Sequence, residues 1–316
     1  MYALALLLGI AGGTLFFHKG VAAGFQDNPN HRSSHRVATP KGAGLGFLAA
    51  LVVASCWLEM DLLFWFPLGL VSLIGFIDDR RGLPALLRLI IHLVAGYLLV
   101  FGVSTCYIGS WSVLLWAVFM TGTANCYNFM DGIDGIAGLT AVAGFAMVAC
   151  YLHLIGSVDD YVRVCVCAGA ACIGFLPYNL PRARVFMGDT GSILLGFLFG
   201  AMVCRFSGNF HEFLIMVSFL FPFYCDELIT MTVRLKNREN LLEPHRKHVY
   251  QLLANQGGCS HVSVAMLYVT IQVGVGTLMI LMRKLPVPVL FSFLVLSFVL
   301  FLSFSCLVRK KYYEES

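Results

Sequence analysis

The chain has 316 residues, of which 59% are hydrophobic and 12% are charged, and its formal net charge is +4. Soluble globular proteins carry about 25% charged residues. An apolar excess of this size cannot be buried in one globular core, so most of it must face lipid. The composition excludes a disordered chain, a collagen-like repeat and a secreted disulfide scaffold, and it predicts a helical protein that crosses a membrane many times.

Apolar runs separated by polar or glycine-rich segments predict eleven membrane-spanning helices. Their expected ranges are 2–17, 44–58, 62–77, 84–101, 108–124, 136–155, 162–177, 190–206, 212–232, 261–281 and 286–308. The alternating pattern of a membrane β-barrel is absent. The sequence therefore predicts an all-α fold with about 11 transmembrane helices, in which residues 1–316 form a single integral-membrane domain.

Lysine and arginine are concentrated in alternate loops. They gather in the segments 18–43, 78–83, 178–189, 233–260 and 309–316, whereas the opposite side has only Arg163, Arg205, Arg283 and Lys284. The positive-inside rule places the basic segments in the cytoplasm. We therefore expect the N-terminus outside and the C-terminus in the cytoplasm.

The acidic residues gather on the same side, although topology gives no reason for it. They include Asp78, Asp79, Asp131, Asp134, Asp189, Asp226 and Glu227. Carboxylates beside basic side chains suggest a site in which acids hold a divalent cation and cations hold phosphate. Asp78 and Asp79 end a predicted helix as a pair, which either binds a cation or is a solvated helix end.

The segment 125–135 carries four side chains with oxygen ligands at steps of three. They are Asn125, Asn128, Asp131 and Asp134. In a helical backbone this spacing brings them toward one side. A polar loop with Asp134 as a helix cap is the alternative, but it explains only that residue.

Three further segments carry polar or basic groups on the predicted cytoplasmic side. The glycine-rich segment around Lys41 suits either phosphate or close helix packing, and Asp189 is either a helix cap or part of an anion site. The segment 245–248 suits either anionic lipid headgroups or a diphosphate. Arg88 and His92 share a helix face, which indicates either that both belong to a binding site or that Arg88 anchors the helix at the membrane interface.

In their order, these motifs resemble the polyprenyl-phosphate N-acetylhexosamine-1-phosphate transferase family. The resemblance depends on TPKGAG at 39–44, DD at 78–79, NCYNFMDGIDG at 125–135, VFMGDTGS at 185–192, Asp226 and HRKH at 245–248. The form HRKHVYQ resembles the branch that initiates O-antigen or related envelope glycans. The peptidoglycan-precursor branch, phospho-MurNAc-pentapeptide transferase, is the alternative within the family.

The resemblance implies a transferase in the bacterial inner membrane, with its active site facing the cytoplasm. Undecaprenyl phosphate would attack a UDP-N-acetylhexosamine, release UMP and form a lipid-linked diphospho-sugar. The implied cofactor is Mg²⁺, with Mn²⁺ as a substitute. Membrane lipid and a second copy of the chain are expected partners, and nucleic acid is not. Direct attack and a covalent aspartyl-phosphate both stay open.

The resemblance also implies roles for individual residues. Asp78, Asp79 and Asp189 match catalytic positions, with Asp78 accepting the proton of the lipid phosphate, and Asp189 and Asn128 match metal ligands. The nucleotide positions are Asn125, Asp131, Asp134 and Phe186. The diphosphate and sugar positions are Lys41, His245, Arg246 and His248, and those for the lipid phosphate are Arg88 and Lys41.

A secondary transporter is the competing class. Transporters place polar residues near the middle of the bilayer, on broken helices in repeated halves. This sequence shows no such repeat and places its polar residues in loops on one side. A structural membrane scaffold would leave the carboxylates unexplained.

Overall fold

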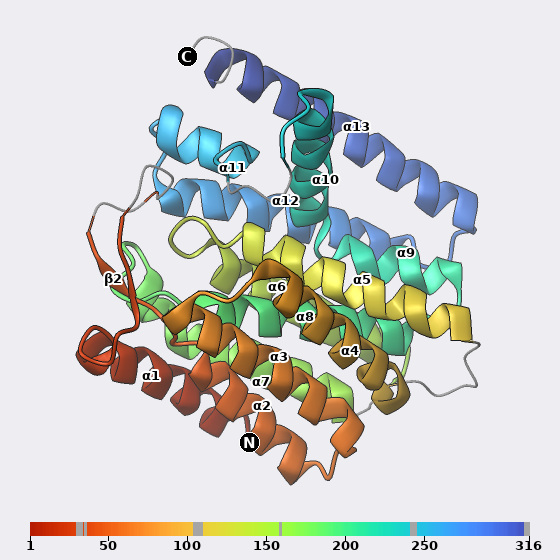
Figure 1. Ribbon diagram of the computed structural model, residues 1–316. Coiled ribbons are helices and arrows are strands. Elements are labelled where there is room, and N and C mark those ends of the chain that lie inside the picture. The colour runs from red at the N-terminus through yellow and green to blue at the C-terminus, as the bar shows by residue number, and fades with distance from the viewer. Residues whose placement is uncertain (30–33, 35–36, 104–109, 158–159, 241–244, 313–316) are drawn as a thin grey trace.

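The computed structural model describes residues 1–316 except 30–33, 35–36, 104–109, 158–159, 241–244 and 313–316. The long helices are α1 (Tyr2–Lys19), α2 (Leu45–Trp57), α3 (Leu62–Arg81), α4 (Ala85–Val103), α5 (Ser110–Phe129), α6 (Ile136–Leu154), α7 (Asp160–Asn179), α8 (Gly188–Phe206), α9 (Phe210–Ser218), α10 (Phe221–Lys236), α12 (His261–Leu281) and α13 (Val287–Tyr312). Short elements are strands β1 (Gln26–Asp27) and β2 (Thr39–Pro40), helix α11 (Val249–Gln251) and the π-helical turn η1 (Leu252–Gln256). The predicted all-helical class is confirmed for the described residues (Figure 1).

One predicted helix is in fact two. The range 212–232 overlaps both α9 and α10, whose axes differ by 89°. Pro222 lies in the first turn of α10, where its missing N–H costs nothing and its fixed φ favours a helix start. The carbonyl of Phe219, at the break, accepts a hydrogen bond of 2.7 Å from the amide of Gln272. That bond satisfies a backbone carbonyl of a fully buried residue.

The predicted number of eleven membrane spans is not confirmed by the lengths of the described helices. Eight described helices are long and apolar enough to cross a membrane, and the bent pair would make a ninth. Helix α2 has 13 residues, about 20 Å of helix, which is shorter than a bilayer core of about 30 Å. Helix α5 has 20 residues but carries polar side chains along its second half. The protein is a multi-pass membrane protein, but eleven full spans are not confirmed.

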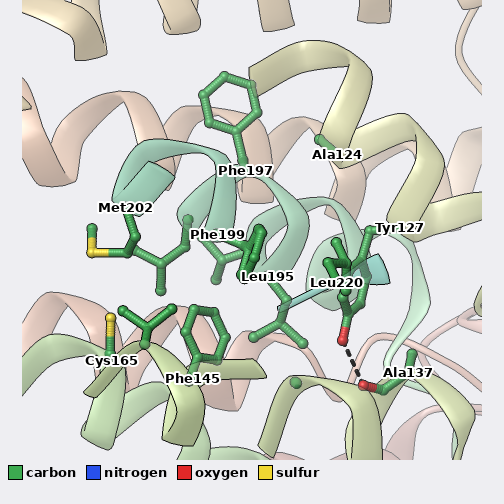
Figure 2. Packing of buried hydrophobic residues seen from close by; sticks show 14 of the residues in the cluster. Ala124, Tyr127, Ala137, Phe145, Cys165, Leu195, Phe197, Phe199, Met202 and Leu220 are labelled. Carbon is green, nitrogen blue, oxygen red and sulfur yellow. Dashed lines mark hydrogen bonds between the residues drawn. The ribbon is translucent and has the colours of Figure 1, made fainter. Parts of the chain in front are cut away.

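Helix α8 lies at the centre of the bundle and packs against α3 and α5. Gly196 meets the backbone of α5 so closely that a Cβ there would lie 2.8 Å from the Cα of Ala124. Figure 2 shows this core, in which the hydroxyl of Tyr127 donates to the carbonyl of Ala137 at 2.5 Å. The core thereby fixes the start of α6 relative to the end of α5.

The helix ends that carry the polar motifs meet at one end of the bundle, on the left of Figure 1. They are the C-terminal ends of α3 and α5 and the N-terminal ends of α4, α8 and α12. Strands β1 and β2 and a backbone bridge between Lys41 and Phe186 lie at the same end. The polar segments that the sequence analysis assigned to one side of the membrane therefore lie at one end of the bundle. Which end faces the cytoplasm stays a prediction.

Candidate active site

Arg88 joins two carboxylates that are far apart in the sequence. Its Nη1 donates to Asp78 at 2.6 Å and to Asp189 at 3.0 Å. The backbone N–H of Leu83 also donates to Asp78, at 2.5 Å. The side chains of Asp78 and Asp189 are 13% and 25% exposed. Both carboxylates therefore lie at the surface of the cluster, beside a cation.

Asp79, next in sequence, has a different environment. It is buried, and it accepts hydrogen bonds from the backbone N–H groups of Asp189 and Thr190, each at 3.1 Å, and from the Thr190 hydroxyl at 2.7 Å. A carboxylate at a helix N-terminus satisfies unpaired N–H groups and favours the helix dipole. Asp79 therefore fixes the first turn of α8, which carries Asp189.

Lys41 lies on the other side of Asp79, with its Nζ 3.4 Å from the carboxylate. The bridge to Phe186 fixes the backbone of Lys41 against the segment that leads into α8. Close approach of these two segments requires glycine, because a Cβ on Gly44 would lie 2.2 Å from the nitrogen of Gly191. Two cations, Lys41 and Arg88, thus flank the carboxylates.

Asn128 reaches the same turn of α8 from α5. Its Oδ1 accepts a hydrogen bond of 2.6 Å from the hydroxyl of Ser192, one turn after Asp189. Carboxylate and amide oxygens are ligands that Mg²⁺ prefers, and Mg²⁺ is usually held by one or two carboxylates and completed by substrate phosphates and water. No three His, Cys, Asp or Glu side chains form a metal-binding group among the described residues. Asp189 and Asn128 both carry side-chain oxygens of the kind that Mg²⁺ binds, and both lie at the first turns of α8.

The predicted nucleotide residues are not all brought together. Asn125 donates its amide to the carbonyl of Thr121 on its own helix, at 2.8 Å. Asp134 pairs with His261, whose Nδ1 is 3.0 Å from the Asp134 carboxylate. Phe186 is half-buried, beside Lys41. Asp134, Phe186 and His261 can face a ligand at this end of the bundle, whereas the side chain of Asn125 is turned to its own helix.

Asp131 lies in the loop after α5. Burial, together with the negative charges of Asp79 and Asp134, raises its pKa to about 7. Asp79, one source of this rise in pKa, belongs to the carboxylate cluster. The side chain is thus neutral for much of the time near neutral pH, when it can donate a hydrogen bond.

A cavity of about 1110 Å³ opens beside this loop. Its lining includes Asp134, His261, Arg182, Arg184 and Thr39. Small-molecule sites are typically about 300–1,000 Å³. The cavity is therefore large enough for a nucleotide-sized ligand and offers it both acidic and basic groups.

The basic segment 245–248 is less cationic than its sequence suggests. Burial and the nearby charges of His248 and Arg234 lower the pKa of His245 to about 3, so its ring is neutral. Lys247 is paired with Glu239. Arg246 is half-buried. Of the three predicted sugar and diphosphate residues in this segment, Arg246 is the one that brings a permanent positive charge.

His248 is 2% exposed and its ring lies between two carboxylates. Its Nδ1 is 3.7 Å from Asp226, and its Nε2 is 3.5 Å from Glu227. Its side chain also caps the short helix α11. The structure thus places His248 inside the protein, where it supports the segment, and a direct contact with substrate stays a prediction.

Several residues in this site were not among those predicted from the sequence. They are Thr190, Ser192, His261, Tyr250 and Tyr268. Thr190 and Ser192 lie within three residues of Asp189, so their place in the motif could have identified them. His261 and Tyr268 lie in an apolar helix far from the motifs, and only the fold brings them to the site.

Comparison with known proteins gives consistent matches. Residues 62–207 match glycosyl transferase family 4. The decaprenyl-phosphate N-acetylglucosaminephosphotransferase of Mycobacterium leprae is 29% identical, over 76% of this chain and 72% of that protein. The undecaprenyl-phosphate alpha-N-acetylglucosaminyl 1-phosphate transferase of Escherichia coli K12 is 28% identical, over 77% and 73%. A probable undecaprenyl-phosphate N-acetylglucosaminyl 1-phosphate transferase of Bacillus subtilis is 24% identical, over 78% and 75%.

The matched family region runs from the start of α3 to the segment after α8, so it includes Asp78, Asp79, Arg88, Asn128 and Asp189. The resemblance found in the motifs is thus confirmed by independent comparisons: the chain is a homologue of the polyprenyl-phosphate N-acetylhexosamine-1-phosphate transferases and carries the glycosyl transferase family 4 region.

Proposed function

We propose that this protein transfers N-acetylhexosamine 1-phosphate from a UDP-sugar to undecaprenyl phosphate. The homologues are named as phosphotransferases that act with a polyprenyl phosphate, which supports the class of reaction. UMP leaves, and the product is a lipid-linked diphospho-sugar. The proposed role is the first step of O-antigen or another envelope glycan, at the cytoplasmic face of the bacterial inner membrane.

One observation carries this proposal: Asp78, Asp79 and Asp189 meet between Arg88 and Lys41 at a single end of a membrane bundle. A lipid phosphate stays at the membrane surface, so its partner groups must lie at helix ends. Arg88 and Lys41 supply positive charge for phosphate oxygens. A transporter would instead place such groups near the middle of the bilayer.

The chemistry is a phosphoryl transfer. An oxygen of the lipid phosphate bonds to the sugar-linked phosphorus of the donor, and the bond from that phosphorus to the bridging oxygen breaks. The bridging oxygen and its electron pair leave with UMP. Asp78 accepts the proton of the lipid phosphate, and Arg88 holds Asp78 and the phosphate together. Such reactions depend mainly on positioning and on stabilising the charge of the phosphoryl oxygens.

Mg²⁺, held by Asp189 and Asn128, is the cofactor that we propose, and when bound it would neutralise charge on the donor diphosphate. Asp134, which lines the large cavity, is a proposed nucleotide contact, together with Asp131 and the half-buried Phe186. Arg246 is the proposed contact to the diphosphate or sugar. In this proposal the cavity binds the UDP-sugar donor and the carboxylate cluster binds the lipid phosphate acceptor. The two regions lie at the same end of the bundle, which supports the proposal.

The test is release of UMP by purified protein. The assay contains undecaprenyl phosphate, Mg²⁺ and a panel of UDP-N-acetylhexosamines, with UDP-GlcNAc first because the relatives are named for that sugar. Formation of UMP and a lipid-linked sugar in equal amounts is expected with at least one donor. Absence of UMP with every donor, or transport of a solute without UMP release, would rule the proposal out.

A further inference from the structure

A single buried carboxylate organises the end of the basic segment. Asp226 is fully buried in α10. It accepts hydrogen bonds from the backbone N–H groups of Val249 at 2.9 Å and Tyr250 at 3.3 Å, and from the hydroxyl of Tyr268 at 2.6 Å. These donors come from α11 and α12. Asp226 therefore fixes the backbone of α11, which directly follows Arg246, Lys247 and His248.

The ring of Tyr250 is held from two sides. It stacks on the ring of His248, with centroids 5.6 Å apart and planes 20° apart, and it meets Tyr268 edge-on at 6.3 Å. Its exposure is 0%. Because the backbone of Tyr250 is also bonded to Asp226, neither the ring nor the backbone can move without breaking several contacts.

The hydroxyl of Tyr250 reaches the opposite side of the site. It donates a hydrogen bond of 2.9 Å to the carbonyl of Phe129, the last residue of α5. It also lies against Gly132, where a Cβ would come within 2.1 Å of the phenol oxygen. Phe129 follows Asn128, and Gly132 follows Asp131. One phenol group therefore connects the basic segment to the loop that carries the proposed metal and nucleotide residues.

We propose that Tyr250 is a positioning residue that sets the distance between Arg246 and the loop 128–134, so that both sides of the donor site form together. This inference rests on the proposed function, because it concerns the UDP-sugar site of that reaction. The role depends on the hydroxyl, since the ring alone cannot bond to the Phe129 carbonyl. The proposal also explains why residue 132 has no side chain.

The test compares three variants. Tyr250→Phe removes the bond to Phe129 and keeps the ring, and Gly132→Ala pushes on the same hydroxyl from the other side. Tyr161→Phe is the matched control, because Tyr161 also donates to a main-chain carbonyl, that of Gly102 at 2.7 Å, at the opposite end of the bundle. Melting temperatures of the three variants show whether they are folded.

For Tyr250→Phe we expect a fall of about tenfold in kcat/KM for the UDP-sugar, with the KM for the lipid phosphate unchanged, since the loss of a buried hydrogen bond has effects of this order. Tyr161→Phe should match the wild type. In the double variant Tyr250→Phe with Arg246→Lys, the fold-loss in donor kcat/KM should be smaller than the product of the two single losses. This is expected because both substitutions disturb the same contacts to the donor. A purely structural role predicts independent effects, so multiplying defects or unchanged donor kinetics would overturn the proposal.

Hydrogen exchange gives a measurement that does not depend on activity. In Tyr250→Phe and in Gly132→Ala, peptides covering 128–134 and 245–251 should both exchange faster than in the wild type, and in Tyr161→Phe neither should change. Unchanged exchange in either peptide would overturn the coupling. Absence of UMP release by the wild type would instead refute the proposed function, so the two failures are distinguishable.

Discussion

Asp189→Asn is the most direct test of the proposed chemistry. The substitution keeps the shape of the side chain and one oxygen acceptor but removes the negative charge. Arg88 loses the negative charge of its partner at 3.0 Å and keeps Asp78 at 2.6 Å, so the cluster should remain assembled. Asp79, which holds the first turn of α8 through backbone N–H groups, is not altered.

The two expected effects differ greatly in size. The side chains of Arg88 and Asp189 are 29% and 25% exposed, so loss of this ion pair should cost about 1 kcal/mol of folding stability or less. Loss of a carboxylate that holds a cation against the diphosphate should cost about 4 kcal/mol of transition-state stabilisation. Because each 1.36 kcal/mol is tenfold, turnover should fall about a thousandfold with little change in melting temperature.

The assay is initial-rate UMP release at fixed Mg²⁺, with the melting temperature measured on the same samples. Asp160→Asn is the matched control, because Asp160 also has an arginine partner at 3.0 Å, Arg163, at the opposite end of the bundle. It should retain wild-type turnover. Near-wild-type turnover of Asp189→Asn, or an equal loss in Asp160→Asn, would refute the assignment of Asp189.

Three other predictions test sidedness, donor binding and pH dependence. In a cysteine-free background, a cysteine at position 240 should react with an impermeant reagent only after permeabilisation; labelling in intact cells would reverse the proposed orientation. Arg246→Lys should lower the donor kcat/KM about ten- to a hundredfold, because charge-assisted bonds contribute about 1.5–3 kcal/mol and lysine lacks the planar fork; a defect confined to the lipid would contradict it. The pKa of Asp131 rises from 3.8 to about 7 on folding, so its stabilising contribution is present below about pH 4 and is lost as the pH rises toward 7. Asp131→Asn should therefore flatten this part of the pH dependence of the melting temperature, and an unchanged slope would contradict the burial of the carboxyl.

The positions of the helices could be predicted because apolar runs in a membrane protein have clear ends. The bend between α9 and α10 was missed because apolar residues continue across the break at 219–220. Pro222 was the available signal, since proline is favoured in the first turn of a helix. The partner of the break, Gln272, lies far along the chain, and no local pattern connects it to Phe219.

The motif residues of the site could be predicted from the sequence, but the contacts between them could not. The motifs identified Asp78, Asp189 and Arg88, yet no spacing rule shows that one guanidinium contacts both carboxylates. The different environments of Asp78 and Asp79 also depend on tertiary contacts, because α8 begins beside Asp79 only in the folded bundle. Likewise, His248 looks like an exposed cation in the sequence, and its burial follows from Asp226 on another helix.

The central position of α8 has a consequence for how the protein is made. In α8, 83% of an 18-residue stretch is buried inside the protein, compared with 17% in α13. Helix α8 therefore exchanges lipid contacts for protein contacts almost completely during assembly. Its main partners α3 and α5 precede it in the chain, so they are already in the membrane when α8 leaves the ribosome. Assembly of the active site therefore follows the order in which the helices are synthesised. A circular permutation that moved α8 to the front of the chain would leave its small and polar residues facing lipid until α3 and α5 had entered the membrane.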